Sequence, residues 1–151
     1  MTKQIKYLKS MICSRVIVDN QTNNISLIDV IEDLTFQIDQ KSISEKPIPF
    51  PIRFDLVSFW KKEKGESDES IDFQIKIVDP KNKETTSYRA NFVFPADMES
   101  MRYILKIMGF LVTISGVYKF IISYKTDDKE YKIVDEIPIS VNIKPIKVLP
   151  K

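Results

Sequence analysis

The stretch Ile71-Asp72-Phe73-Gln74-Ile75-Lys76-Ile77 decides the fold class of this chain, because apolar and polar side chains alternate at every position. Successive side chains of a β-strand point to opposite faces, so this alternation predicts a strand with one buried and one solvated face. The same period-two pattern recurs at 52–60 before it and at 88–94 after it. The three segments predict a mainly β structure.

Short apolar runs separated by turn residues continue toward both ends of the chain. Alternation over 7–18 and 25–36, with the turn 19–24 between them, predicts an N-terminal hairpin. Segment 97–108 fits both a strand and one short amphipathic helix, and we favour the strand because its neighbours are strands. About eight or nine short strands predict an all-β antiparallel sandwich rather than a tightly coiled barrel, whose corners usually need glycine.

Length and composition indicate one folded domain. The chain has 151 residues, of which 43% are hydrophobic and 29% are charged, as is ordinary for a globular protein. We expect a single sandwich domain over residues 1–143. An extended tail containing lysine and proline is expected over residues 144–151.

Three residue counts exclude most catalytic chemistry. The chain has no histidine, one cysteine and three glycines. It therefore cannot build a histidine-dependent triad, a His-ligated metal site, an all-cysteine zinc site or a glycine-rich phosphate loop. Carboxylate pairs remain available among the 21 acidic residues, so a carboxylate-based hydrolase stays an alternative. We expect a protein that is not an enzyme and that uses no cofactor or metal.

Charge and hydropathy favour a cytoplasmic location. The formal net charge of +2 arises from 23 basic and 21 acidic side chains that are interspersed, which gives no strong nucleic-acid signal. The N-terminal apolar run is interrupted by Ser14 and Arg15, and no segment reaches the roughly 18 apolar residues of a membrane span. Cys13 lies in an apolar run, which favours a buried thiol.

Several segments resemble one known family. Ser14-Arg15-Val16-Ile17-Val18-Asp19, followed by Ile25-Ser26-Leu27-Ile28-Asp29-Val30-Ile31-Glu32, resembles the opening strands of a family of small, uncharacterised bacterial domains. Gly116-Val117-Tyr118-Lys119-Phe120 resembles the G-x-Y-x-F strand of that family, and Ile137-Pro138-Ile139-Ser140-Val141 resembles its closing strand. Asp29 stands where the family usually has glycine. The resemblance implies an antiparallel immunoglobulin-like β-sandwich and supplies no activity.

Two acidic loops, at 66–69 and 127–130, are candidate cation sites. Calcium takes about six to eight oxygen ligands, and C2-type sandwiches bind membranes through calcium held in such loops. Neither loop follows a known ligand spacing, so we favour solvated turns. A calcium-dependent, C2-like membrane-binding domain is kept as an alternative function, which a higher Tm in calcium would support.

Trp60 indicates which side of its strand is buried. Its alternation with other apolar residues predicts a core position, so the opposite side would expose Val57 and Phe59, and neighbouring strands would expose Val78 and Val93. An exposed apolar sheet face is typical of a partner surface. We therefore expect a non-catalytic interaction module that binds a protein partner, or a second copy of itself, through a sheet face or edge. Binding of single-stranded nucleic acid is a further alternative if Phe59 lies exposed among lysines.

Overall fold

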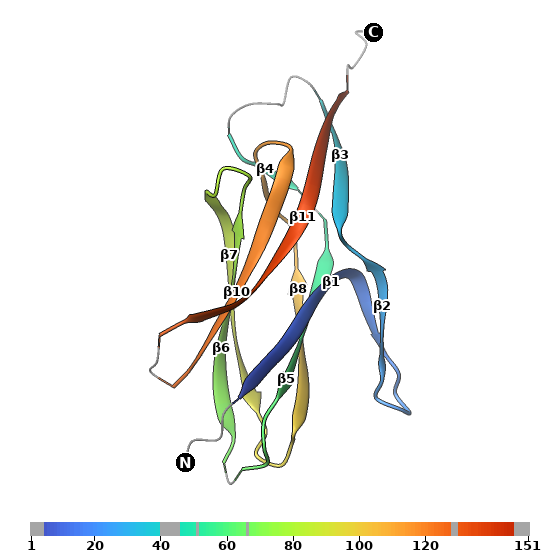
Figure 1. The fold of residues 1–151 in the computed structure, drawn as a ribbon. Helices are drawn as coiled ribbons and strands as arrows, with labels where there is room; N and C mark the ends of the chain where they lie inside the picture. Colours follow the sequence, from blue (N-terminus) through green and yellow to red (C-terminus); the bar gives the residue numbers. More distant parts are fainter. Residues whose placement is uncertain (1–4, 40–45, 51, 66, 128–129, 147–151) are drawn as a thin grey trace.

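The computed structural model describes residues 5–39, 46–50, 52–65, 67–127 and 130–146 (Figure 1). These residues form eleven strands and contain no helix. The prediction of an all-β chain is confirmed, although the strands outnumber the eight or nine expected, and several, such as those at Glu69–Val78 and Lys132–Ile146, are longer than the alternation suggested. Segment 97–108 contains a strand, as we favoured.

Two large sheets make up most of the molecule. The first has four strands in the order β2-β1-β5-β8; their bounds are β1 Lys6–Val18, β2 Ile25–Val30, β5 Phe54–Lys61 and β8 Ser100–Ile107. The second has five strands in the order β3-β11-β10-β6-β7; their bounds are β3 Asp33–Asp39, β6 Glu69–Val78, β7 Glu84–Phe94, β10 Gly116–Thr126 and β11 Lys132–Ile146. A small pair joins β4 (Ile48–Phe50) to β9 (Phe110–Val112). Every pairing among these strands is antiparallel except that of β3 with β11.

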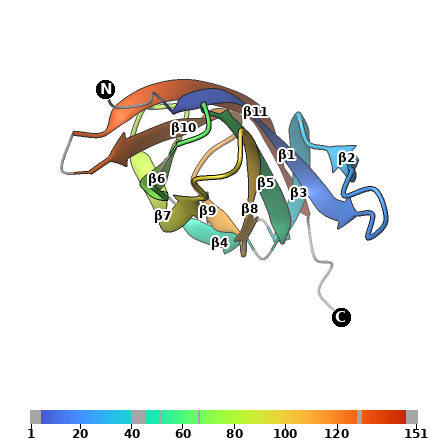
Figure 2. The same cartoon turned by 90° about the horizontal axis from the view of Figure 1, so that it is seen from below.

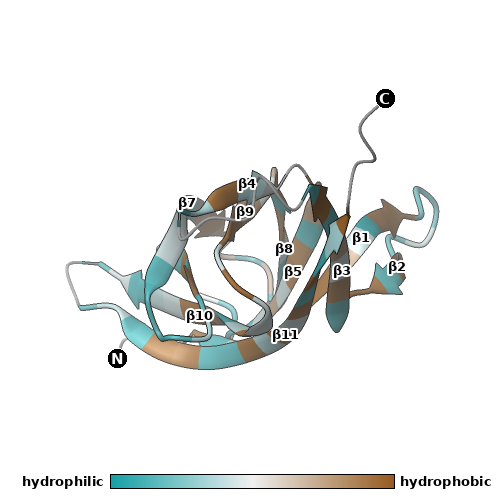
Figure 3. Cartoon of the chain, turned by 90° about the horizontal axis from the view of Figure 1, so that it is seen from above, coloured by the Kyte–Doolittle hydropathy of each residue, from teal (hydrophilic) through white to brown (hydrophobic). Residues whose placement is uncertain are grey.

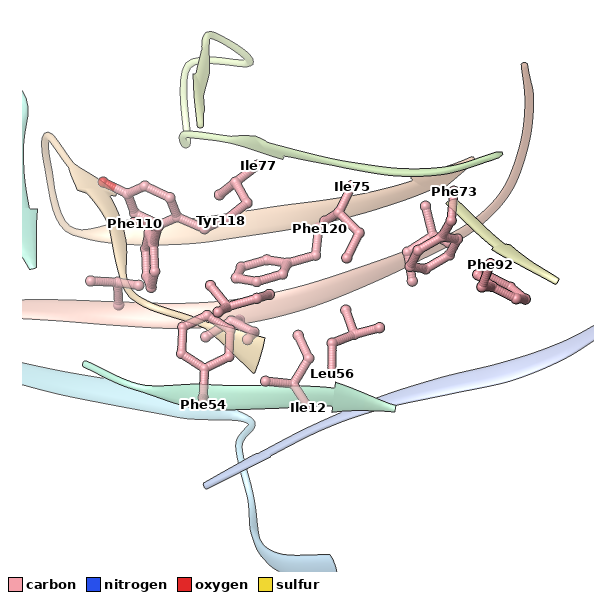
Figure 4. Packing of buried hydrophobic residues seen from close by; sticks show 14 of the residues in the cluster. Ile12, Phe54, Leu56, Phe73, Ile75, Ile77, Phe92, Phe110, Tyr118 and Phe120 are labelled. Carbon is pink, nitrogen blue, oxygen red and sulfur yellow. The ribbon is translucent and has the colours of Figure 1, made fainter. Parts of the chain in front are cut away.

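The two sheets face each other across one apolar core, as expected of a sandwich. Ile12, Phe54 and Leu56 point from the four-stranded sheet toward Phe120 and Ile75 of the five-stranded sheet (Figure 4). Trp60 is buried in this core, as its alternation predicted, and its indole nitrogen donates to Ser58 Oγ at 2.8 Å. Figure 3 shows the brown and teal bands along β11 that result from period-two patterning.

A bulge near the start of β1 changes which of its residues enter the core. The register of β1 on β5 shifts between Tyr7 and Lys9, so Tyr7 faces Trp60 and Leu8 stays exposed. Tyr7 Oη donates to Asp135 Oδ2 at 2.8 Å and thereby ties β1 to β11 of the other sheet. Burial, and after it this carboxylate, raise the pKa of Tyr7 above its ordinary range.

The last described strand runs beyond the predicted domain end at Ile143. Lys144, Pro145 and Ile146 pair with β3, so these residues belong to the sheet and not to an extended tail at 144–151. Proline is tolerated here because only β3 flanks this part of β11. The rest of the predicted tail, 147–151, lies outside the described residues.

The predicted N-terminal hairpin is confirmed in part: β1 pairs antiparallel to β2 beyond Ile12, but the predicted second strand, 25–36, breaks after Val30 and its last residues belong to β3. Asp29 adopts a φ of 52°, in the left-handed region that glycine favours, just before the chain leaves β2. The chain then crosses from the four-stranded to the five-stranded sheet, where it forms β3. Seen from below, this hairpin projects from the side of the molecule opposite β6 and β7 (Figure 2).

Candidate interaction surface

The structure separates the four residues predicted to form a partner surface. Val57 and Phe59 lie on β5 of the four-stranded sheet, whereas Val78 and Val93 lie on β6 and β7 of the five-stranded sheet. Val57 and Val78 are buried, Phe59 is half-buried, and Val93 has 48% of its surface exposed. The prediction of one exposed face made by all four residues is therefore wrong, because two of them are covered and the other two lie on different sheets.

Val57 faces away from the core, as its alternation with Leu56 requires, but other side chains cover it. Met11 of β1 and Ile104 of β8 stand directly opposite it on the two neighbouring strands. Cross-strand pairs of this kind contact one another on a single face of the sheet. Met11, Val57 and Ile104 therefore form an apolar row on the outer face of the four-stranded sheet.

A two-stranded ribbon, residues 14–30, leans over this outer face. It consists of the end of β1, the connecting turn and β2. The part of β1 that precedes the ribbon pairs with β5. Two hydrogen bonds hold the ribbon there: Val16 N donates to Asp55 Oδ2 at 3.0 Å, and Arg102 Nη2 donates to Asn23 Oδ1 at 2.9 Å. Arg102 is on β8, the strand farthest from β2 in the sheet, so the turn reaches β8 only by folding back across the outer face.

We call the outer face of the four-stranded sheet together with the overlying ribbon the ribbon face. Its apolar members are Met11, Cys13, Ile17, Ile28, Val30, Val57, Phe59 and Ile104. Cys13 and Val57 are fully buried, whereas Ile17 and Val30 on the ribbon have 43% and 46% of their surfaces exposed. The ribbon face thus has a covered centre and an apolar margin that is open to solvent.

Cys13 is the free thiol of the ribbon face. Burial and the nearby Asp55 carboxylate raise its pKa, so the thiol keeps its proton more firmly than an exposed cysteine does. The predicted buried thiol is confirmed.

The charged side chains of the ribbon face are mostly of one sign. The strand register, together with the alternation of side chains along each strand, places the following basic residues on the ribbon face: Lys6, Lys9, Arg15, Lys61, Arg102 and Lys106. Three acidic residues accompany them: Asp55, which stands opposite Lys106 and accepts the hydrogen bond from the ribbon, and the exposed Asp19 and Asp29 of the ribbon itself. Lys9 Nζ lies 5.4 Å from the centroid of the Phe59 ring, in a cation–π contact.

The outer face of the five-stranded sheet has a different composition. Both basic and acidic residues lie on it. Lys125 of β10 stands opposite Asp72 of β6, and Glu136 of β11 stands opposite Ile121 of β10. The Tyr131 ring lies under Lys125, whose Nζ is 4.8 Å from its centroid. Val93, Val117 and Ile133 are exposed singly on this side of the molecule. Isolated apolar side chains among mixed charges are ordinary surface.

The predicted acidic loops are only partly within the described residues. Asp68 Oδ1 accepts a hydrogen bond from Ala96 N at 2.8 Å, and Glu69 is the first residue of β6. Glu66 and residues 128–129 lie outside the described ranges. Over the ranges that can be described, no three His, Cys, Asp or Glu residues are grouped so that they could hold a metal ion.

Comparison with protein-family models finds no match to this sequence, and comparison with curated proteins finds none either. Within the described residues, no helix has the length and apolar character needed to cross a membrane.

Sequence reasoning missed most of the ribbon face. The alternation of Lys9, Met11, Cys13, Arg15 and Ile17 along β1 carries the signal, because apolar and basic residues occupy the side of the strand opposite the core residue Ile12. What it could not reveal is the folding of the ribbon over β5 and β8. That contact depends on residues far apart in sequence.

Proposed function

We propose that this chain is a non-catalytic interaction module that binds a protein partner through the ribbon face. The observation that carries the proposal is the apolar margin formed by Ile17 and Val30, which continues a covered apolar centre across the sheet. Contiguous apolar surface surrounded by polar residues is typical of protein-binding sites. A cytoplasmic location is part of the same proposal, consistent with a free, buried thiol at Cys13.

We also propose that the scaffold is immunoglobulin-like. Two features support it. The Tyr118 hydroxyl, near the start of β10, donates to Ile114 O at 2.8 Å and accepts from Thr113 N at 2.9 Å, which is the arrangement of the tyrosine corner. The strand β3 switches sheets and pairs parallel to the last strand β11 at the edge of the five-stranded sheet. The family of uncharacterised bacterial domains named above remains the predicted relative.

Photocrosslinking in cells that express the protein tests the proposed function. A benzoylphenylalanine replaces Val30 on the ribbon face or, as the control, Val117 on the outer face of the five-stranded sheet. The two positions are matched, because each valine has 46% of its surface exposed. We expect a discrete protein adduct from position 30 and none from position 117. An adduct with twice the mass of the chain would identify a second copy as the partner, and equal yields at both positions would contradict the proposal.

A further inference from the structure

We propose that the partner bound at the ribbon face is an acidic polypeptide segment that also carries apolar side chains. This inference rests on the proposed function and specifies the chemistry of the partner. It draws on three features: the excess of basic over acidic side chains on the ribbon face, the more even mixture of charges on the outer face of the five-stranded sheet, and the open edge of the ribbon.

The first step concerns charge. On the ribbon face Lys6 stands directly opposite Lys61, and Arg102 and Lys9 flank Phe59 on its two sides. Like charges placed directly opposite on a sheet repel each other and destabilise it. A ligand that places carboxylates among these groups relieves the repulsion and gains attraction at the same time. The face therefore selects for negative charge through electrostatic complementarity.

The second step compares the two sides of the sandwich. On the outer face of the five-stranded sheet, lysines stand among acidic residues, as Lys125 does beside Asp72. The net charge of the chain is only +2, so the basic character of the ribbon face is a local property and not a property of the whole surface. An acidic ligand that diffuses toward the molecule is steered to this side.

The third step decides for a polypeptide. The strand β2 is the last strand of its sheet, and in the described residues its ladder pairs it with β1 alone. An edge strand presents backbone N–H and C=O groups that an extended peptide can pair with by strand addition. Neither a lipid surface nor a nucleic acid can complete that ladder. The aromatic residue of the face, Phe59, is half-buried under Lys9, which leaves little ring surface for stacking with bases.

The test uses defined probes and two matched charge-reversal variants. The ribbon-face variant carries Lys6→Glu, Lys61→Glu and Lys106→Glu. The control variant carries Lys76→Glu, Lys119→Glu and Lys144→Glu on the outer face of the five-stranded sheet. All these lysines are exposed, and both variants change the net charge equally. Circular dichroism and thermal unfolding establish that each variant folds.

The main probe is a short synthetic peptide that alternates glutamate and valine, and its Kd is measured by fluorescence anisotropy at low and high salt. A lysine–valine peptide and a glutamate–serine peptide control for the sign of the charge and for the apolar side chains. We expect the glutamate–valine peptide to bind the natural chain most tightly of the three and to bind more weakly as salt rises. We expect the ribbon-face variant to lose about tenfold in affinity or more, and the control variant to stay within about twofold.

Several results would overturn the inference: no binding of the glutamate–valine peptide, equal losses in both variants, or equal binding of the lysine–valine peptide. Tighter binding of phosphatidylserine vesicles or of an oligothymidylate than of the peptide would also overturn it. If position 30 captures a protein in cells while charge reversal leaves that capture unchanged, the ribbon face is the interaction surface but its partner is not acidic. The inference then fails and the proposed function stands.

Discussion

The two outer faces of this sandwich are built from the same alternation of side chains, yet they differ in cover and in charge. On the ribbon face, Val57 is fully buried although it points away from the core, and the basic residues in the surrounding rows outnumber the acidic ones. On the outer face of the five-stranded sheet, Val93 and Val117 stay exposed among charges of both signs. The difference shows that alternation determines which side chains point away from the core, whereas the neighbouring strands determine whether those side chains are then covered.

The largest expected effect is the loss of stability in Val57→Asp, which is compared with that in Val93→Asp. A carboxylate at position 57 would be buried beside Met11 and Ile104 without a partner, which we expect to lower the free energy of unfolding by about 3–5 kcal/mol. At position 93 the same carboxylate is half-exposed, and we expect a change within about 0.5 kcal/mol. Urea unfolding monitored by Trp60 fluorescence measures both. Similar losses in the free energy of unfolding for the two variants would contradict the claim that position 57 is covered and position 93 is open.

The next prediction concerns the attachment of the ribbon. Arg102→Ala removes the hydrogen bond to Asn23 at the ribbon turn, and we expect the Cys13 thiol to react severalfold faster with Ellman's reagent because the ribbon opens more often. The global free energy of unfolding should fall by only about 0.5–1.5 kcal/mol. Arg89→Ala, on the outer face of the five-stranded sheet, is the control and should leave the thiol rate unchanged. An unchanged rate in Arg102→Ala would mean that this contact does not hold the ribbon.

The smallest effect comes from the two lysines that stand directly opposite each other, Lys6 and Lys61. Lys61→Glu replaces a like-charge pair with Lys6 by an opposite-charge pair, so we expect a gain of about 0.2–1 kcal/mol in the free energy of unfolding at low salt. The gain should shrink at high ionic strength because both residues are exposed. Lys76→Glu, whose cross-strand neighbours are Ser87 and Ile121, should give no gain. A loss of stability in Lys61→Glu would show that the basic side chains do not repel each other.

Much of the fold could be predicted from the sequence because it depends on local alternation. The pattern at 71–77 identified a half-buried strand, and the position of Trp60 identified the buried side of β5. Segment 97–108 was ambiguous because methionine and leucine fit both periods, and the neighbouring strands decided it correctly.

The candidate site could not be predicted in the same way. The burial of Val57 depends on its cross-strand neighbours Met11 and Ile104, which are remote from it in sequence. The position of the ribbon depends on the equally remote contact between Asn23 and Arg102. The continuation of the last strand past Ile143 could not be predicted either. That part of β11 pairs in parallel with β3, and alternation does not reveal which strands are neighbours. The bulge after Tyr7 leaves Leu8 exposed, and nothing in the local sequence predicts that bulge.

The ratio of photocrosslinked adduct at position 30 to that at position 117 tests the central claim most directly. The two valines are equally exposed, so the ratio compares the two outer faces and not the accessibility of the probes. If the ribbon face is the interaction surface, the adduct forms at position 30 and is at background at position 117. An adduct confined to position 117, or equal adducts at both positions, would contradict the account.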